Sequence, residues 1–378
     1  MRVLFAGVPG AGHLFPLVPL ARAMRSLGHE VAFASMDGGE PVAASGLPYL
    51  PIAPGVDWSK EIRALGRTLR PELLQQVVET NSADREAFVP LAALVNTLVA
   101  DAAVELAERW RPDLVVYDYQ FPVALLAATS LGVPAVQHDL GFVRTPGLRA
   151  LMLAEMAEAF ARHGADRLPE PAATIDIAPP SMAGAEPYGW SLRPVAYNGE
   201  GDGALPDPLA APAHRPRVAV TLGTVPPKTD GLTRIERVIA AAAETDAEFV
   251  LATGDLDLGT LGTLPDNVRA YGWVPWRALL DTCAAAIHHG GSGTALAALD
   301  AGVPQLVLPD GSDRFINADA VRDRGAGLSA TAEQIGPALL DRLLTDPALT
   351  AAAREVSAEI AAMPSPTEVA ERLTRLAG

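Results

Sequence analysis

Residues 2–35 read RVLFAGVPGAGHLFPLVPLARAMRSLGHEVAFAS, and this stretch decides the fold. Two short apolar runs, residues 2–8 and 31–35, enclose a stretch with helical periodicity at residues 14–27, which ends before Gly28. This order predicts a strand, a loop, a helix and a second strand. Strands joined through helices run parallel and are covered on both faces, so we expect an α/β protein built on a parallel sheet.

The same alternation continues through the first half of the chain and starts again in the second. In the first half, strands are predicted at residues 113–117 and 134–137, with helices at 71–79, 87–109 and 121–131. In the second half, strands are predicted at 218–222, 248–252, 284–288 and 303–308, with helices at 232–244 and 294–300. We therefore expect two Rossmann-like parallel-sheet domains, at residues 1–196 and 217–362, with a Gly- and Pro-rich linker at 197–216 and a last helix within 363–378 that returns to the first domain.

Composition and charge narrow the class of protein. The 378 residues, of which 49% are apolar, suit two domains with substantial cores. The formal charge of −16 would repel nucleic acid and anionic lipid, so neither is an expected partner. No apolar run reaches the roughly 18 residues of a membrane span, and the start of the chain reads as a strand without a signal-peptide pattern. With a single cysteine, Cys283, no internal disulfide forms, and we expect a cytoplasmic protein.

Residues 287–294 (IHHGGSGT) predict a ligand-binding turn between a strand and a helix. Glycines let the backbone approach a ligand, and the N-terminus of the helix, opened by Thr294, carries partial positive charge that suits a phosphate or diphosphate. His289 adds a donor for an anionic oxygen. The spacing matches neither the phosphate loop of ATPases nor the dinucleotide fingerprint of dehydrogenases. A glycine-rich turn with a purely structural role is the alternative.

Two further segments place ligand-binding side chains after predicted strands. Residues 271–280 (YGWVPWRALL) contain two tryptophans, and an exposed one could stack on a nucleobase, although a core tryptophan is the alternative. Residues 309–317 (PDGSDRFIN) include Asp313, whose carboxylate could accept hydrogen bonds from sugar hydroxyls. A solvated loop carboxylate is an equally good interpretation of Asp313.

These three segments, in this order, resemble the donor-binding signature of nucleotide-sugar-dependent glycosyltransferases of the GT-B fold, in the bacterial branch that glycosylates polyketide and antibiotic aglycones. The resemblance extends along the chain. It includes the opening strand and loop at residues 2–13 and the segments 194–199 (PVAYNG), 302–309 (GVPQLVLP) and 363–366 (MPSP). It implies two facing domains with a cleft between them, the first binding a hydrophobic acceptor and the second a nucleotide-sugar.

The resemblance also implies roles for individual residues. On the donor side it assigns Trp273 and Val274 to the base, His289, Gly291, Gly293 and Thr294 to the diphosphate, Asp313 and Arg314 to the sugar, and Gly223 and Thr224 to the neighbourhood of the phosphates or sugar. The acceptor-facing middle of the first half resembles the family least, and we expect Phe15, Asp139 and Phe142 to bind the acceptor.

Two departures from the family pattern refine the expected donor. The plant members carry a glutamate that grips both ribose hydroxyls of uridine diphosphate, where this chain has Ala297. A pentose without the 2′-hydroxyl would lose little there, so thymidine diphosphate is the expected nucleotide. The Asp-Gln pair that grips glucose hydroxyls appears here as Asp313-Arg314, which favours a deoxysugar.

A catalytic base is expected from the first half. His13 and Asp118 each follow a predicted parallel strand, and a His held by a carboxylate can take a proton from an acceptor hydroxyl as that oxygen attacks the anomeric carbon. The resemblance implies this pair. From the residues alone, His13 could equally be a capping or core histidine and Asp118 a strand-end cap. Asp139 is a second possible base, which would support attack through carbon instead of oxygen.

The expected activity is inverting transfer of a deoxysugar from a thymidine diphosphate donor to a hydrophobic natural product such as a polyketide, because one direct displacement needs only a base and a stabilised leaving group. Residues 255–257 (DLD) have the DxD form of a metal motif, but the helix N-terminus and His289 already favour the leaving diphosphate, so no essential metal is expected. The alternatives are a nucleotide-sugar epimerase of the same fold and a catalytically silent partner protein. The sequence leaves open a homodimer.

Overall fold

The computed structural model describes residues 1–79, 84–165, 167–184, 188–199, 204–223, 231–254, 262–309, 311 and 313–378. The chain divides into two compact units. Unit 1 comprises Met1–Ala178, Glu186–Gly199 and Pro364–Gly378, and unit 2 comprises Pro179–Ala185 and Glu200–Met363. Residues 179–184, which the sequence places in the first domain, join unit 2 because Ser181 donates its backbone N–H to Glu359 at 2.6 Å.

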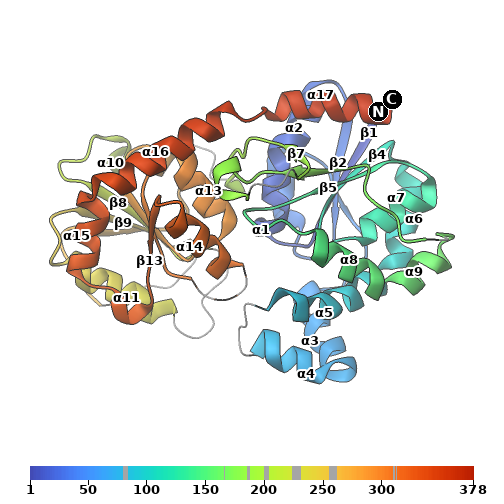
Figure 1. Ribbon diagram of the computed structural model, residues 1–378, viewed down its shortest axis with the longest axis horizontal. Coiled ribbons are helices and arrows are strands. Elements are labelled where there is room, and N and C mark those ends of the chain that lie inside the picture. Colours follow the sequence, from blue (N-terminus) through green and yellow to red (C-terminus); the bar gives the residue numbers. More distant parts are fainter. Residues whose placement is uncertain are drawn as a thin grey trace. The chain divides into compact units, whose positions relative to one another are not determined.

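The described part of unit 1 contains a seven-stranded sheet in the order β3-β2-β1-β4-β5-β6-β7, with all neighbours parallel (Figure 1). The strands are β1 (Arg2–Ala6), β2 (Glu30–Ser35), β3 (Tyr49–Pro51), β4 (Leu114–Asp118), β5 (Ala135–His138), β6 (Ala173–Asp176) and β7 (Trp190–Ser191). The chain leaves β1 toward β2 and β3, and then returns to the other side of β1 with β4. The carboxyl ends of β1 and β4 therefore flank the point where the strand order reverses, which is where ligands bind in such sheets.

Helices cover both faces of this sheet (Figure 1). They are α1 (Ala11–Leu14), η1 (Phe15–Leu17), α2 (Val18–Ser26), η2 (Glu40–Ser45), α3 (Trp58–Leu69), α4 (Pro71–Leu74), η3 (Gln75–Glu79), α5 (Arg85–Leu98), α6 (Ala100–Trp110), α7 (Val123–Leu131), α8 (Pro146–Glu155), α9 (Ala157–Arg162) and α17 (Pro366–Ala377). Successive β1 side chains point to opposite faces. Leu4 and Ala6 join the core formed with α5, α6 and α7, while Val3 and Phe5 are buried on the other face.

The single helix expected at residues 87–109 is wrong, because the structure breaks it into α5 and α6. The two helices meet at Val99 with a bend of 53°. Val99 is 1% exposed, and Val95 and Ala103 on either side are also buried, so the bend keeps both apolar faces against the sheet. Within the described residues no single helix is long and apolar enough to cross a membrane, and only this bent pair passes by length and composition.

The described part of unit 2 contains a six-stranded parallel sheet in the order β10-β9-β8-β11-β12-β13 (Figure 1). Its strands are β8 (Arg217–Thr221), β9 (Glu248–Ala252), β10 (Val268–Tyr271), β11 (Ala285–His288), β12 (Gln305–Val307) and β13 (Gly327–Ser329). Its helices are η4 (Pro180–Met182), α10 (Asp207–Ala210), α11 (Gly231–Ala242), α12 (Trp276–Leu280), α13 (Ser292–Asp300), α14 (Arg314–Asp323), η7 (Ala332–Gln334), α15 (Pro337–Thr345) and α16 (Pro347–Ala362). Here the strand order reverses between β8 and β11.

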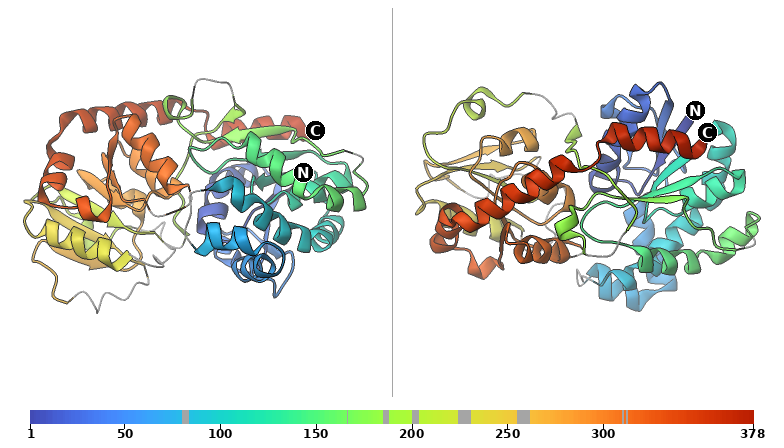
Figure 2. Two further views of the ribbon diagram at one scale, coloured as in Figure 1. Left: turned by 60° about the horizontal axis from the view of Figure 1, so that its bottom comes forward. Right: turned by 45° about the horizontal axis from the view of Figure 1, so that its top comes forward.

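The last helix, α17, belongs to unit 1 although it follows α16 of unit 2 in the chain. Ser365 and Glu368 form a capping box and Pro366 occupies the first turn, which explains why the helix restarts there. Figure 2 shows α17 beside the N-terminal part of the chain, where it packs on α2.

Candidate functional site

His13 and Asp118 meet at the carboxyl edge of the unit 1 sheet. Nδ1 of His13 lies 2.5 Å from Oδ2 of Asp118. The Asp118 side chain is fully buried, whereas 28% of the His13 side chain is exposed. With the carboxylate as acceptor, the ring proton belongs on Nδ1, which leaves Nε2 as the basic nitrogen. The structure thus joins two residues 105 positions apart into a His–Asp pair.

The backbone around the pair fixes the carboxylate. Gln120 donates its backbone N–H to Oδ1 of Asp118 at 2.9 Å, and Val8 donates to Oδ2 at 3.4 Å. Glycine at position 7 allows this approach, because a Cβ there would lie 3.2 Å from the Asp118 Cβ and 3.1 Å from a methyl of Leu14. Asp118 is therefore held by β1 and β4 together and can orient His13 without moving.

The structure places Asp139, the other carboxylate proposed as a base, inside unit 1. Asp139 is 1% exposed. Its Oδ1 accepts hydrogen bonds from Gln137 Nε2 at 2.8 Å and Thr145 Oγ1 at 3.0 Å, and its Oδ2 accepts one from the Tyr188 hydroxyl at 2.7 Å. Burial raises the pKa of Asp139 to about 6, although these three donors act to lower it. Both oxygens are engaged, so this geometry does not present Asp139 to an acceptor.

The two aromatic residues expected to bind an acceptor are also packed within unit 1. Phe15 is half-buried and makes an edge contact with Tyr197, with ring centroids 4.8 Å apart. Its ring also lies against Gly199, where a Cβ would be 3.3 Å from the ring edge. Phe142 is 6% exposed. An acceptor role for these two side chains stays a prediction.

In unit 2 the glycine-rich turn joins β11 to α13, which begins at Ser292 and not at Thr294 as expected. Ala295 makes the first hydrogen bond of the helix, to the carbonyl of Gly291, at 3.0 Å. The N–H groups of Ser292, Gly293 and Thr294 thus have no acceptor inside the helix and are available to an anion. The earlier start moves the N–H groups of the expected anion site two residues toward the glycine-rich turn.

His289 packs against two glycines that leave room for its ring. A Cβ on Gly223 would lie 2.5 Å from its Cε1, and a Cβ on Gly291 would lie 2.6 Å from its Nε2. Burial and the neighbouring charge of Arg314 lower the pKa of His289 well below 6.5, so the ring is neutral and offers a hydrogen bond rather than a positive charge. Gly223 follows β8 and His289 follows β11, so the two meet where the strand order reverses. Thr224 lies outside the described residues.

Asp313 lies directly beside the turn. Its Oδ2 accepts hydrogen bonds from Ser292 Oγ at 3.0 Å and from Asn317 Nδ2 at 3.2 Å. Arg314 starts α14, and its backbone oxygen would be 3.0 Å from a Cβ on Gly290. Sequence reasoning missed Asn317, although an amide four residues after Asp313 on a helix is a readable signal.

The two tryptophans of the segment after β10 have different environments. Trp273 is 51% exposed, whereas Trp276 is 8% exposed and its indole N–H points to the carbonyl of Thr294 at 3.5 Å. Val274, which lies between them in the sequence, is 6% exposed. The core interpretation fits Trp276, and the exposed ring of Trp273 remains available for stacking. Ala297, in α13, is 3% exposed.

No metal centre is found in the part of the chain that the structure describes, where no group of three or more His, Cys, Asp or Glu side chains could hold an ion. Residues 255–257, the DxD segment, lie outside it.

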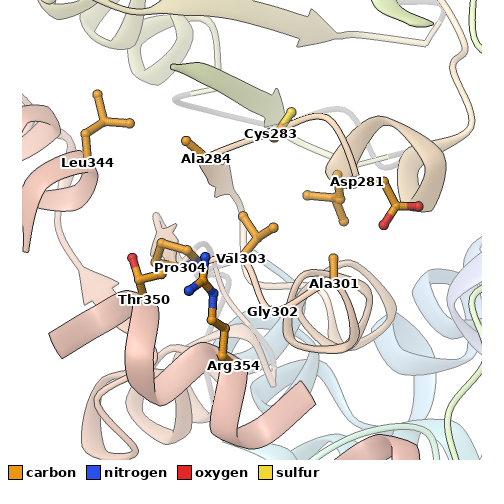
Figure 3. Close-up of a pocket in the computed structure, with 11 residues that line it drawn as sticks. Asp281, Cys283, Ala284, Ala301, Gly302, Val303, Pro304, Leu344, Thr350 and Arg354 are labelled. Atoms are coloured by element: carbon orange, nitrogen blue, oxygen red, sulfur yellow. The ribbon is translucent and has the colours of Figure 1, made fainter. Parts of the chain in front are cut away.

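Figure 3 shows a pocket of about 280 Å³ in unit 2. No residue of the glycine-rich turn lines it. Cys283 and Ala284 line it just before β11, and Gly302, Val303 and Pro304 just before β12, so it opens at the amino ends of these strands. Burial raises the pKa of Cys283 to about 12, which keeps its thiol protonated. Because the candidate donor residues follow the carboxyl ends of the strands, the pocket at the amino ends is separate from the candidate donor site.

Residues 22–223 match the family described as erythromycin biosynthesis protein CIII-like, N-terminal domain, and residues 236–376 match the corresponding C-terminal domain. The elloramycin glycosyltransferase ElmGT of Streptomyces olivaceus is 40% identical over 99% of this chain and 97% of its own length.

Solved structures resemble the whole chain. The glycosyltransferase SnogD from Streptomyces nogalater matches with a TM-score of 0.86 and 39% identity, covering 100% of this chain and 99% of SnogD. The spinosyn rhamnosyltransferase SpnG, complexed with thymidine diphosphate, matches with a TM-score of 0.85 and 31% identity, covering 99% of this chain and 100% of SpnG. Both comparisons confirm the expected GT-B fold.

Proposed function

Because the chain belongs to the erythromycin CIII-like family of glycosyltransferases, we propose that it transfers a deoxysugar from a thymidine diphosphate donor to a hydrophobic natural-product acceptor, with inversion at the anomeric carbon. The family and the GT-B fold make it a glycosyltransferase of antibiotic biosynthesis. The proposal concerns its donor, its acceptor and its mechanism.

The donor side of the proposal depends on unit 2. The N–H groups that begin α13 and the neutral ring of His289 suit a diphosphate, and the exposed Trp273 suits a base. Ala297 offers no carboxylate to a 2′-hydroxyl, which favours thymidine over uridine diphosphate. The solved SpnG complex contains thymidine diphosphate, which supports the same choice. Asp313 and Arg314 are the proposed sugar-binding residues.

The observation that carries the mechanism is the 2.5 Å contact between His13 Nδ1 and Asp118 Oδ2. His13 Nε2 would take the proton of an acceptor hydroxyl while that oxygen forms its bond to the anomeric carbon. The bond from this carbon to the diphosphate oxygen breaks, and the electron pair leaves with the diphosphate. Asp118 stabilises the imidazolium that results. One displacement from the opposite face inverts the configuration, and no covalent sugar–enzyme intermediate is needed.

The direct experiment incubates the purified protein with a thymidine diphosphate deoxysugar and a panel of aromatic polyketide and macrolide acceptors. We expect a product heavier by one sugar in mass spectrometry, inverted configuration from its anomeric coupling constant, and tighter binding of thymidine than of uridine diphosphate. Isomerised donor without transfer would instead indicate an epimerase. Absence of donor binding and turnover with every acceptor would indicate a silent partner protein.

We also propose that transfer needs no metal ion, because backbone N–H groups and His289 can stabilise the leaving diphosphate by hydrogen bonds. Dialysis against EDTA should leave turnover within about twofold of the untreated protein, because the activation free energy should hardly change. A loss of activity restored by Mg²⁺ or Mn²⁺ would contradict this and would draw attention to Asp255 and Asp257.

Homodimer formation, which light scattering would detect, also stays a prediction.

A further inference from the structure

Both polar groups of the Gly290 backbone are held by buried side chains of unit 2. Its N–H donates to Nδ1 of His288 at 3.0 Å, and its carbonyl accepts from Nδ2 of Asn317 at 2.8 Å. His288 and Asn317 are both fully buried. Neither side chain has a role in the proposed function, yet together they fix the residue at the centre of the glycine-rich turn.

The hydrogen bonds determine the state of the His288 ring. Because Nδ1 accepts from Gly290, the ring proton must lie on Nε2, which is 2.6 Å from Oε1 of Gln305. The Gln305 amide then donates to the carbonyl of Ala295 in α13 at 3.3 Å. Burial lowers the pKa of His288 to about 4, so the ring stays neutral near pH 7. The ring thus links Gly290 to the first turns of α13 in one orientation.

Asn317 connects the turn to the proposed sugar site. Besides the Gly290 carbonyl, its Nδ2 lies 3.0 Å from Oγ of Ser292, the first residue of α13, and 3.2 Å from Oδ2 of Asp313. Gly290 has φ of +93°, and a Cβ there would lie 3.0 Å from the Arg314 carbonyl oxygen. The backbone therefore has little freedom to compensate if the amide is lost.

We propose that Asn317 and His288 are positioning residues that hold Gly290 so that the N–H groups beginning α13 and the Asp313 carboxylate keep one fixed geometry for the diphosphate and sugar of the donor. This inference rests on the proposed donor site. Preorganised groups bind and react without reorganising, so an error of about 1 Å at the turn can cost up to about a hundredfold in rate.

The test compares Asn317→Ala and Asn317→Asp with a matched amide elsewhere in unit 2. Asn267 also places one Nδ2 near three oxygens, the carbonyls of Ala242, Thr245 and Ala247, at 2.8, 3.2 and 2.9 Å. None of these three residues belongs to the glycine-rich turn. Asn267→Ala should lower the melting temperature while leaving nucleotide affinity unchanged. Asn317→Asp keeps the side-chain shape but replaces the donor with an acceptor beside Asp313, so it should be at least as harmful as Asn317→Ala.

Calorimetry with thymidine diphosphate and with thymidine diphosphate rhamnose, a deoxysugar donor, together with donor kinetics, supplies the readouts. For both Asn317 variants we expect kcat/KM for the donor to fall about tenfold to a hundredfold, while the KM for the acceptor stays unchanged. The nucleotide-sugar should also bind more tightly than thymidine diphosphate alone by a smaller factor than in the wild type. Hydrogen exchange should show a protected Gly290 amide that loses protection in Asn317→Ala and keeps it in Asn267→Ala.

The outcomes separate this inference from the proposed function. If the wild type binds neither thymidine nor uridine diphosphate, the donor site and the inference both fail. If the wild type binds thymidine diphosphate but the Asn317 variants bind and turn over donor as well as Asn267→Ala does, the donor site stands and the positioning role is overturned. Imidazole ¹⁵N shifts that place the His288 proton on Nδ1 would also overturn the proposed clamp.

Discussion

Their hydrogen-bond partners distinguish the two buried carboxylates, Asp118 and Asp139, that could take part in proton transfer. Asp118 is completely buried, but its carboxylate contacts Nδ1 of His13, whose side chain is 28% exposed. Asp139 is also buried, and its oxygens receive three hydrogen bonds from neighbouring side chains. Only the first arrangement connects a buried charge to a partly exposed proton acceptor, so we favour His13 as the base and oxygen as the attacking atom.

Removing the imidazole tests this choice. His13→Ala should lower kcat by about 10²- to 10⁴-fold, the usual loss for a general base, while thymidine diphosphate binds as in the wild type because the proposed donor residues lie in unit 2. Asp118→Asn should lose less, and the double variant should be little worse than His13→Ala, because the two act as one unit. Steady-state rates and calorimetry measure both effects. Normal turnover in His13→Ala, with activity abolished in Asp139→Asn, would assign the base to Asp139.

Trp273 gives an independent test of the nucleotide site. Its ring is 51% exposed, so removing it leaves little cavity and the fold should not change. Stacking on a base contributes about 1–3 kcal/mol, and Trp273→Ala should therefore weaken thymidine diphosphate binding by roughly fivefold to a hundredfold. Trp276→Ala is the contrasting variant, since it should destabilise unit 2. Equal affinity of wild type and a folded Trp273→Ala protein would remove Trp273 from the base site.

At the scale of elements, the sequence was most informative where the pattern is local. The β11–α13 turn could be predicted because glycines, histidines and the following helix are contiguous. The contact of His289 with Gly223 could not, since it joins residues 66 positions apart through the pairing of β8 with β11. The break at Val99 was missed because the apolar helical pattern continues across it, and only packing on the sheet decides the bend.

The Asp139 cluster is an element-level feature that sequence patterns did not reveal. Tyr188, just before β7, donates to Asp139 just after β5, so the carboxylate ties a late segment of unit 1 to the central sheet. Such a contact depends on the β5-β6-β7 order, which local periodicity does not encode.

This cluster predicts a specific dependence of stability on pH. The pKa of Asp139 is about 6 in the folded protein and 3.8 in the reference state, so the folded state binds more protons between these values. The free energy of unfolding therefore falls as pH rises from about 4 to 6 and levels off above, by at most about 3 kcal/mol for this group. Asp139→Asn should remove this part of the slope. Urea unfolding of both proteins at pH 4, 5, 6 and 7 measures it, and parallel curves would refute the shifted carboxyl.

At the scale of the whole molecule, the chain uses one topological device twice. In unit 1 the reversal of strand order brings together His13 after β1 and Asp118 at the end of β4. In unit 2 the equivalent reversal brings together Gly223 after β8 and His289 after β11. The duplicated strand–helix pattern predicted both sheets, and candidate residues after the strands then followed from the rule that ligands bind at the carboxyl ends. The acceptor residues followed no such pattern.

The final helix shows that neighbours in the chain need not share a unit. Arg372 of α17 lies over the Trp190 ring with its guanidinium carbon 3.7 Å from the centroid, and Thr374 lies 2.9 Å from Nε2 of His29. Val369 and Leu373 are buried. Pro364, just before the helix, accepts a hydrogen bond from the Arg193 backbone at 2.8 Å. The contacts of α17 thus join β7, the start of β2 and the segment after β7.

Deleting residues 364–378 should therefore destabilise unit 1 and spare unit 2. Burying a Val or Leu side chain contributes about 1.5–3 kcal/mol each, so loss of Val369 and Leu373 alone would cost roughly 3–6 kcal/mol, a large fraction of the stability of one domain. Hydrogen exchange should show faster exchange in β1, β2 and α2, with β8 and β11 unchanged. Thymidine diphosphate should still bind within about twofold, while transfer is lost because His13 and Asp118 depend on β1 and β4. Arg372→Ala serves as the milder variant, with the same regions affected to a smaller degree. Loss of protection in β8 and β11, with β1 and β2 unaffected, would show instead that α17 stabilises unit 2.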